Sequence, residues 1–342
     1  MTTPSDYWNA RAATYDTLRW VNNTELLRWC VDRATVFARR PAWVQEIGCG
    51  TGALTEALAL ALPGSLREFV ATDVSEEMIG RARDRFLRPT CTANPPRFVT
   101  TPTGMVYPPS DPDWIAPPRV PVHAFPHDAE WGSAWVAPDG VVFELDETTW
   151  TDRDGNAFDL DGVRRPYPSR PRLPGWDLVV SRMVLHHAPV TERDAQPIDA
   201  PARLVRDWFD LVAPGGSLAI CEGVPPVPGP HASTDLFRAA MDLKEPGRHV
   251  FYAHDIARWV SAAGAAEVAV FDTWTSGNSV RNWAMNGGAD PDTADRLLAM
   301  HRDAVRKDPT VAEAYDAVIT TTDDVLMRWR HCVVVGRRGP VT

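Results

Sequence analysis

The chain has 342 residues, with 35 Lys and Arg against 45 Asp and Glu, which gives a formal net charge of −10. Its 44% hydrophobic and 23% charged residues are ordinary globular usage and exclude disordered, fibrous and coiled-coil classes. The acidic balance argues against binding to duplex nucleic acid, which requires a basic surface. The length suits one elaborated domain or two small ones, and we expect a single domain over residues 1–342.

The sequence shows no pattern of a membrane span, a signal peptide or a disulfide framework. The longest apolar stretch, Ala53 to Leu62, is broken by Thr55 and Glu56 and is far shorter than the ~18 residues that a span needs. The N-terminal residues lack a basic region followed by an apolar one, and the five cysteines form no CxxC pair. We therefore expect a cytoplasmic protein with neither a membrane nor a nucleic-acid partner, and the oligomeric state is not predicted.

Short β-type runs alternate with helical patterns along the chain, which predicts a parallel sheet with crossover helices. A strand at Trp43–Ile47 leads through a Gly-rich turn into an amphipathic helix. A second strand, Glu68–Asp73, precedes a helix for which Ser75 is the expected N-cap. The third strand is expected at Val120–Phe125, with Arg97–Thr101 as a competing candidate.

The second half of the chain continues the alternation. Strands are expected at Trp176–Ser181, Ser217–Cys221, Glu267–Phe271 and Cys332–Gly336, and helices at Pro201–Val212, Asp255–Ala263, Thr293–Lys307 and Val311–Ile319. Between these two halves lies a proline-crowded stretch, in which turns at 138–140 and 154–156 predict β-hairpins.

Four segments are expected as insertions into the sheet-and-helix pattern: 88–118, 131–175, 223–252 and 272–330. Ligands of open α/β sheets bind beyond the carboxyl ends of the strands. The last three segments leave from those ends, so we expect them to form a cap over a ligand site. The first leaves from a helix and should lie at the opposite end of the sheet.

Residues 46–52 (EIGCGTG) are the most informative part of the chain, because a strand runs into three alternate glycines and then directly into a helix. Glycines there permit positive φ and close backbone approach, and the helix N-terminus presents free N–H groups. Such a turn binds a nucleotide-like ligand. Asp73, at the end of the second strand, is placed to accept hydrogen bonds from ribose hydroxyls. Gly48-x-Gly50-x-x-Ala53 also fits the dinucleotide fingerprint, so two ligand classes compete.

The register of Glu46 with the three glycines resembles E-x-G-x-G-x-G, the first motif of class I (Rossmann-like) S-adenosylmethionine-dependent methyltransferases. Later motifs of that family are similar to residues 73–78 (DVSEEM), 127–130 (HDAE), 176–187 (WDLVVSRMVLHH) and 211–220 (LVAPGGSLAI), in the same order. Tyr7-Trp8-Asn9 and Tyr15-Asp16 look like the lid of the ubiquinone- and menaquinone-biosynthesis type. The resemblance implies an α/β fold with a doubly wound, mostly parallel seven-stranded sheet, an antiparallel last strand and large cap insertions.

The resemblance also implies a cofactor, S-adenosylmethionine, and the residues that bind it. These are Tyr15, Glu46, Gly48, Cys49, Gly50, Gly52, Asp73, Val74, Met78, Asp128, Ala129, Ser181 and Met183. The implied activity is methyl transfer to a small-molecule acceptor, and the large caps and the composition look like enzymes of specialised metabolism. A cyclase or lyase that uses the cofactor without methylating, and a binding-only relative, are the alternative interpretations.

On the acceptor side, His186 and His187 follow the fourth strand, where family members place acceptor-side groups. A histidine there can take a proton from an O–H or N–H nucleophile, although packing or loop capping is the alternative role. His187 is the first choice for such a catalytic base.

The predicted substrate-binding residues are Tyr7, Trp8, Arg248 and Trp283. Arg248 belongs to a set of side chains that can anchor an acidic group unless they are merely solvated: Arg238, Lys244, Arg248, His249 and Arg281. No metal is expected, since His123 and His127 are widely separated on a strand and lack a third ligand.

Overall fold

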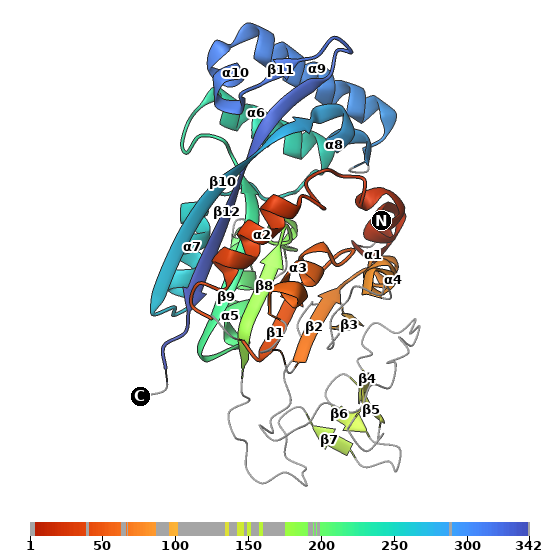
Figure 1. Ribbon diagram of the computed structural model, residues 1–342, viewed down its shortest axis with the longest axis vertical. Coiled ribbons are helices and arrows are strands. Elements are labelled where there is room, and N and C mark those ends of the chain that lie inside the picture. Colours follow the sequence, from red (N-terminus) through yellow and green to blue (C-terminus); the bar gives the residue numbers. More distant parts are fainter. Residues whose placement is uncertain are drawn as a thin grey trace.

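The computed structural model describes residues 4–38, 41–62, 66, 68–86, 96–101, 175–190, 194, 196, 199–286 and 289–340, and the backbone of four short strands between 134 and 159. The predicted sheet forms the centre, and a helical layer lies beyond one end of it (Figure 1). None of the helices in these ranges is both long and apolar enough to cross a membrane.

The central sheet has the strand order β3-β2-β1-β8-β9-β12-β10, and the short β11 pairs with β12 outside this path. The strands are β1 Trp43–Ile47, β2 Glu68–Asp73, β3 Arg97–Thr100, β8 Trp176–Arg182, β9 Val212–Val224, β10 Glu267–Ser279, β11 Val318–Ile319 and β12 Val325–Arg337. Neighbours on the path pair in parallel, except that β12 is antiparallel to both β9 and β10. This topology confirms the predicted seven-stranded sheet with an antiparallel last strand.

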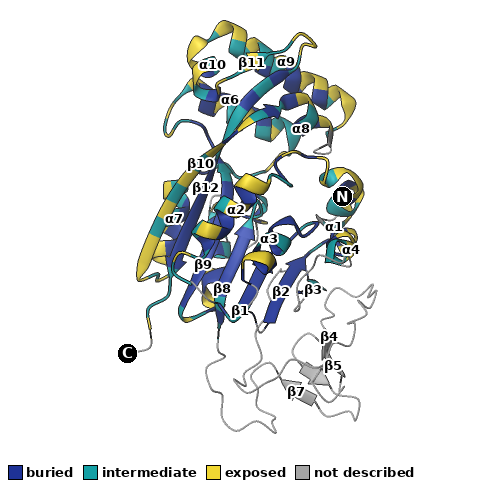
Figure 2. Ribbon diagram, viewed as in Figure 1, coloured by how far each residue is buried: buried dark blue, intermediate teal, exposed yellow. Residues whose placement is uncertain are grey.

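Helices cover both faces of this sheet because successive side chains of a strand point to opposite sides. Val180 of β8 belongs to the core on one face, and its neighbour Val179 belongs to the core on the other. The first face is covered by α2 (Thr24–Ala34), α3 (Ala53–Ala61) and α4 (Glu76–Phe86), and the second by α5 (Asp199–Asp210) and α7 (Ala253–Ala262). Figure 2 shows the central strands buried between these layers.

The strand beside β2 is Arg97–Thr100, so the prediction of Val120–Phe125 as the third strand is wrong and the competing candidate is correct. Val120–Phe125 lies outside the described residues. The Phe98 ring packs against Phe86 at the end of α4, with ring centroids 5.3 Å apart. The expected insertion 88–118 therefore contains a strand of the sheet.

The two C-terminal strands reach far beyond the apolar runs that predicted them. β10 and β12 have 13 residues each, and they remain paired beyond the last contact of β12 with Val224 of β9. Their outer halves support a layer of helices: α6 Ala232–Lys244, α8 Val280–Asn286, α9 Pro291–Lys307 and α10 Pro309–Tyr315. This layer has hydrophobic cores of its own, which include Leu236 with Leu298 and Trp283 with Leu297.

The predicted helix at Thr293–Lys307 is confirmed by α9, but the helix predicted over Val311–Ile319 ends early. Asp316 adopts a left-handed backbone conformation with φ 46°, which terminates α10. Val318–Ile319 then pairs with β12 as β11. Two β-branched residues thus extend the sheet where the pattern predicted a last helical turn.

A second, antiparallel sheet has the order β4-β5-β6-β7. Its strands are β4 Ala134–Val136, β5 Val142–Asp146, β6 Thr149–Thr151 and β7 Ala157–Asp159. The pairs β4–β5 and β6–β7 flank the turns predicted at 138–140 and 154–156, as hairpins require. The prediction that 131–175 covers a ligand site depends on residues outside the described part of the chain.

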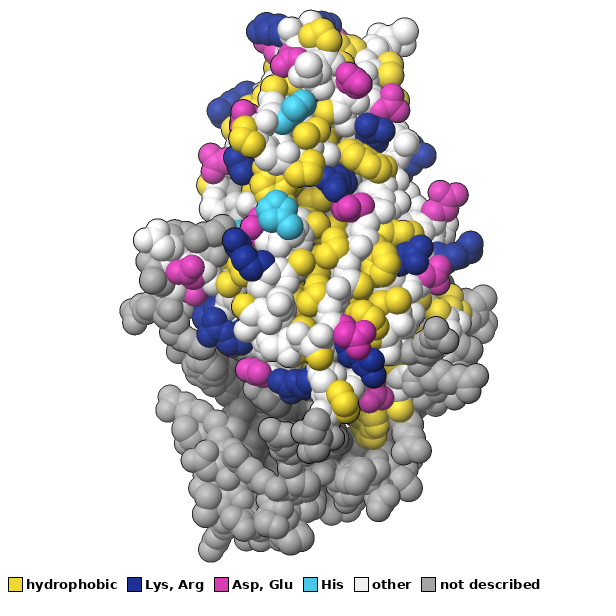
Figure 3. All heavy atoms as spheres, turned by 90° about the vertical axis from the view of Figure 1, so that its left-hand side faces the viewer, with side chains coloured by type: hydrophobic (Ala, Val, Ile, Leu, Met, Phe, Trp, Pro, Cys, Tyr) yellow, Lys and Arg dark blue, Asp and Glu magenta, His cyan; other side chains and the backbone are white. Residues whose placement is uncertain are grey.

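One edge strand of the central sheet is β10, whose outer face exposes Val268, Val270 and Trp274. Figure 3 shows hydrophobic side chains along this side of the molecule, interspersed with charged ones. Ion pairs join β10 to β12 at two positions, Glu267 to Arg337 and Asp272 to Arg330. Charged side chains on an edge strand disfavour pairing with further strands.

Candidate active site

The Gly-rich turn between β1 and α3 has the backbone that the sequence predicted. Gly48, Gly50 and Gly52 have φ of 69°, 53° and 82°, in the region that side chains with a Cβ rarely adopt. A Cβ added at Gly48 would lie 2.2 Å from Cγ2 of Val184, which follows β8. A Cβ at Gly50 would meet Cε1 of Tyr15 at 3.5 Å. A side chain at position 48 would therefore collide with Val184, and one at position 50 would extend toward Tyr15. Because these residues are glycines, the turn keeps a shallow cradle over its backbone.

Asp73, at the end of β2, faces this turn. Its Oδ2 accepts a hydrogen bond from the Gly50 N–H at 2.8 Å, and its Oδ1 accepts one from the Ser75 N–H at 2.9 Å. Burial raises the pKa of Asp73, while these backbone bonds favour its charged form. Each carboxylate oxygen has a further lone pair, so Asp73 can still accept hydrogen bonds from a ligand. Ser75 is the predicted N-cap, since its Oγ accepts from the Met78 N–H at 3.1 Å.

A small cavity lies over the turn, with Glu46 beneath it. Burial raises the pKa of Glu46 to about 8, and the Thr55 hydroxyl donates to its Oε2 at 2.6 Å. The residues that line the cavity are Tyr15, Trp20, Val21, Glu46, Gly48, Cys49, Gly50, Thr51, Ala53, Leu54 and Arg182.

The N-terminal helix α1 (Pro4–Tyr15) is held against the end of β2. Asn9 Oδ1 accepts hydrogen bonds from the Ser75 hydroxyl at 2.6 Å and from the Glu77 N–H at 3.3 Å. Past the helix, Asp16 Oδ1 accepts from the Thr51 hydroxyl of the Gly-rich turn at 2.5 Å. These contacts place α1 over the cradle, where the resemblance implied a lid.

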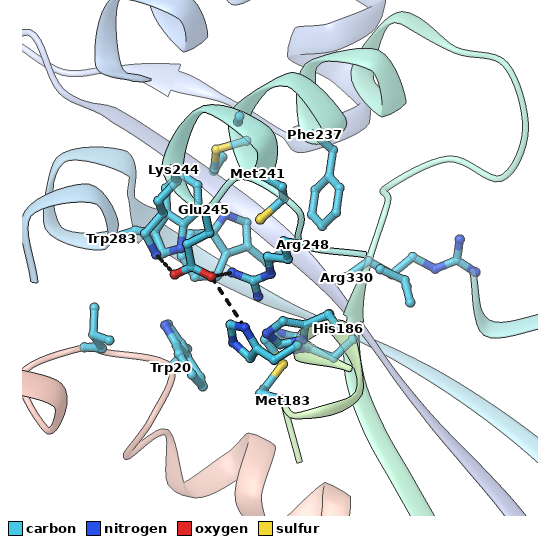
Figure 4. Close-up of a pocket in the computed structure, with 18 of the residues that line it drawn as sticks. Trp20, Met183, His186, Phe237, Met241, Lys244, Glu245, Arg248, Trp283 and Arg330 are labelled. Atoms are coloured by element: carbon cyan, nitrogen blue, oxygen red, sulfur yellow. Dashed lines mark hydrogen bonds and ion pairs between the residues drawn. The ribbon is translucent and has the colours of Figure 1, made fainter. Parts of the chain in front are cut away.

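A larger pocket opens between the carboxyl end of β8 and the helical layer (Figure 4). It encloses about 1010 Å³ of empty space, part of it open to solvent. Aromatic, methionine and charged side chains make its walls: Trp8, Arg11, Tyr15, Leu18, Trp20, Met183, His186, His187, Gly223, Val224, Phe237, Ala240, Met241, Lys244, Glu245, Arg248, Trp283, His301, Tyr315, Met327, Trp329, Arg330 and His331. Tyr15 and Trp20 line both cavities, so the two cavities adjoin.

The two predicted histidines lie in a 3₁₀ turn, Leu185–His187, directly after β8. His186 uses its Nδ1 in a buried contact with Oε2 of Glu222, 2.7 Å away, while Oε1 of Glu222 accepts the Leu185 N–H at 2.7 Å. Burial raises the pKa of Glu222 to about 8 and lowers that of His186 well below its ordinary value. This pair fixes the turn, which leaves His187 as the histidine better placed to act on a ligand.

His187 faces the larger pocket with about a quarter of its side chain exposed. Its ring packs edge-on against Trp8, with centroids 5.1 Å apart. Burial, then the neighbouring His186 and Arg248, lower the pKa of His187 well below its ordinary value and outweigh the opposite effect of Glu245. The imidazole is therefore uncharged at neutral pH and has a nitrogen lone pair that can accept a proton.

Glu245, just past the end of α6, lies at the centre of a cluster of cations in this pocket. Its Oε1 is 3.0 Å from Arg11 Nη1 and 3.6 Å from Lys244 Nζ, and its Oε2 is 3.0 Å from Arg248 Nη1. His187 Nδ1 is 3.8 Å from the same Oε2 (Figure 4). Burial alone would raise the pKa of Glu245, but the surrounding positive charges outweigh it and hold that pKa at about 2.

Three of the predicted substrate-binding residues, Trp8, Arg248 and Trp283, line the larger pocket together with the histidines. Tyr7 does not line it, but its ring lies under the guanidinium of Arg11, with the Arg11 Cζ 3.5 Å from the ring centroid.

Five of the predicted cofactor-binding residues line the small cavity: Tyr15, Glu46, Gly48, Cys49 and Gly50. Met183 lines the larger pocket, in a left-handed conformation with φ 61°. Others lie nearby without lining either cavity: Gly52, Asp73, Val74, Met78 and Ser181. Asp128 and Ala129 lie outside the described residues.

Sequence reasoning missed Arg11, Arg182, Glu222 and Glu245. Each reaches the site from a different element, so no local spacing connects them. The sequence offered a signal for Glu222, because this carboxylate directly follows the apolar run of a predicted strand. In the structure its side chain is buried, with 1% exposed. A carboxylate at such a position requires a partner.

Comparisons with known proteins identify a family and a fold for this chain. A family model described as "Methyltransferase domain" matches residues 22–270, which is most of the chain. None of the curated proteins compared with the chain matches its sequence significantly.

Among solved structures, the YcgJ protein of Bacillus subtilis is 12% identical, with a TM-score of 0.54, over 91% of this chain and 99% of that one. A putative methyltransferase of Bacillus halodurans is also 12% identical with a TM-score of 0.54, over 90% of this chain and 98% of that one. The [4+2]-cyclase SpnF is 14% identical, over 93% of this chain and 81% of that one, with a TM-score of 0.41. At such low identity, the first two similarities support the fold alone.

Proposed function

The chain belongs to the methyltransferase-domain family and is an S-adenosylmethionine-dependent enzyme of it, and on that premise we propose that its acceptor is a small molecule held in the larger pocket beside His187. One observation carries this proposal. The cradle of the Gly-rich turn and the aromatic-walled pocket adjoin at Tyr15 and Trp20, so a donor in one cavity can face an acceptor in the other.

The residues of the small cavity fit the cofactor. The glycine cradle accepts a close backbone approach, and the Asp73 carboxylate has free lone pairs for ribose hydroxyls next to the Gly50 N–H. When bound there, S-adenosylmethionine supplies an activated methyl group. Glu46 and Arg182 line the same cavity and would contact the amino-acid end of the cofactor.

The chain itself must align the acceptor, exclude water and receive a proton. Methyl transfer needs alignment at near-attack distance and a dry site. The packed aromatic walls of the pocket and the α1 lid align the acceptor and exclude water. His187 would take the proton of an acceptor that is protonated at neutral pH. The turn fixed by His186 and Glu222 holds it in place. Of the expected cap segments, 223–252 contributes α6 and 272–330 contributes α8 to the pocket wall.

The test is incubation of the protein with S-adenosylmethionine and a collection of phenols, amines and carboxylic acids, including aromatic compounds typical of specialised metabolism. Mass spectrometry should find S-adenosylhomocysteine together with an acceptor heavier by one CH₂ group. A Gly50→Val variant, whose side chain would fill the cradle, is the inactive control. Methylthioadenosine would instead indicate a lyase or cyclase. Cofactor binding without any product across the collection would indicate a binding-only protein.

A further inference from the structure

The larger pocket carries an excess of positive charge in a chain whose net charge is −10. Its charged lining consists of Arg11, Lys244, Arg248 and Arg330 against Glu245. Arg330 forms an ion pair of 3.0 Å with Asp272, which does not line the pocket. The other three cations share the single carboxylate of Glu245. The cluster is therefore short of negative charge.

Glu245 cannot satisfy its three partners. Each of its oxygens already has a guanidinium nitrogen at 3.0 Å, and the Lys244 ammonium is farther away, at 3.6 Å. A guanidinium has five N–H donors and an ammonium has three, so most donors of the cluster are not used by this carboxylate. The side chains are only 5–11% exposed. Burying cations without full compensation is costly.

Aromatic rings hold two of these cations in place. The Arg11 guanidinium lies over Tyr7, and the Lys244 ammonium lies over Trp283, with Nζ 4.5 Å from the ring centroid. Such contacts position a cation while leaving its donors free for another partner. Trp283 also lines the pocket, together with Trp8 and Trp329. The site thus combines prepositioned cations with flat apolar walls.

We infer that the methyl acceptor is an aromatic or otherwise flat molecule with an oxyanion group, a carboxylate or a phosphate, bound by Arg11, Lys244 and Arg248. This inference rests on the proposed function, because it identifies the occupant of the same pocket. Glu245 acts as a positioning residue that keeps the three cations together. Oε2 of Glu245 in this cluster is 3.8 Å from Nδ1 of His187, so the anionic group binds beside the proposed base.

The experiment measures binding of benzoate, phenyl phosphate and benzamide to the protein saturated with S-adenosylhomocysteine, by calorimetry at low salt. The three probes share a ring, and only the first two carry an anion. At least one anion should bind tenfold or more tightly than benzamide, and the tighter of the two identifies carboxylate or phosphate as the preferred group. Equal affinities, or no binding of any probe, would overturn the inference.

Two variants sharpen the test. Arg248→Gln should weaken binding of the preferred anion at least tenfold. The matched control is Arg238→Gln, on the exposed side of α6 and outside the pocket lining, which should leave the affinity unchanged. Affinity for S-adenosylhomocysteine should stay the same in both variants, which shows that they fold. If both variants bind the anion like the unmodified protein, the assignment of the cluster fails, whereas the proposed function fails only if no acceptor yields S-adenosylhomocysteine.

Anion binding should also depend on pH through Lys244. Burial lowers the pKa of Lys244 to about 7, against the opposing effect of Glu245. The charged and titratable groups that face it are Glu245 and Arg248 after α6, Arg11 from α1, and His186 and His187 after β8, and the Trp283 ring of α8 packs against it. Affinity for the preferred anion should therefore fall as pH rises through 7, and Lys244→Met should abolish this dependence. A merely structural cluster would show no such change.

Discussion

The small cavity and the larger pocket are built in different ways. Most of the lining of the small cavity comes from one continuous stretch, residues 46–54, which Asp73 contacts from the end of the adjacent strand. Only Tyr15, Trp20, Val21 and Arg182 reach it from elsewhere among the lining residues. The larger pocket, which we propose for the acceptor, is lined by α1, the turn after β8, the end of α6, α8 and β12, which are far apart in the sequence. The cradle follows from local backbone rules, such as positive φ at glycine. The pocket depends on packing among distant elements, so its chemistry becomes visible only in the folded chain.

The largest expected effect is a loss of methyl-transfer rate on substitution of His187. His187→Ala should lower the methyl-transfer rate by ~10²–10⁴ for an acceptor that is protonated at neutral pH, which is the usual loss when a general base is removed. Cofactor affinity should change little, because His187 does not line the small cavity. Single-turnover rates and calorimetry with S-adenosylhomocysteine measure the two quantities.

His187→Gln is the control for hydrogen bonding, since glutamine cannot take the proton, and it should be nearly as harmful as alanine. The pH profile gives a second check. A base works when it is deprotonated, and the pKa of His187 lies well below 6.5, so the rate should rise with pH only below 6.5 and then level off. Full activity in both variants would remove His187 from the mechanism.

The next effect concerns the cradle. Asp73→Ala removes a charged acceptor for ribose hydroxyls, and hydrogen bonds to charged groups contribute roughly 1.5–3 kcal/mol each. Affinity for S-adenosylhomocysteine should fall at least tenfold. The variant also frees the Gly50 and Ser75 N–H groups, so circular dichroism must show that the fold is kept. The affinity of Asp73→Asn, which keeps one acceptor oxygen, should lie between those of the unmodified protein and of Asp73→Ala. Unchanged affinity would place the ribose elsewhere.

The smallest effect concerns α1, which we propose as a lid over both cavities. Asn9→Ala removes two hydrogen bonds that tie α1 to the start of α4. A neutral hydrogen bond contributes about 0.5–1.5 kcal/mol, so cofactor affinity and the transfer rate should each fall by up to about tenfold. Thr14→Ala, at an exposed position of α1, should change neither. A loss confined to one of the two quantities would show that the lid serves only one cavity.

The parts of the fold that follow from local patterns could be predicted from the sequence. The alternation of apolar runs and helical patterns predicted the central strands, and Glu46 with three alternate glycines predicted the cradle. The third strand was misplaced because Arg97–Thr100 is short and only partly apolar, with Phe98 as its buried residue. The length of β10 and β12 was missed because their outer halves carry polar and aromatic residues such as Thr273 and Arg330, which form no apolar run.

The charged half of the site could be predicted only in part. Lys244 and Arg248 were candidates for anchoring an acidic group, and so were Arg238, His249 and Arg281, but only the first two line the pocket. Nothing in their spacing distinguished them. Their function depends on Glu245 between them and on Arg11, which arrives from the N-terminal helix, 234 positions away from Glu245. Contacts over such separations come from the tertiary fold, so a single sequence gives no direct indication of them.

We expect donor and acceptor to face each other where the two cavities meet. A crystal structure of the protein with S-adenosylhomocysteine tests this expectation most directly. The ribose hydroxyls should bind the Asp73 carboxylate, the cofactor should lie over the Gly-rich turn, and its sulfur should point past Tyr15 and Trp20 toward His187. A cofactor whose ribose lies away from Asp73, or whose sulfur points away from the larger pocket, would contradict it.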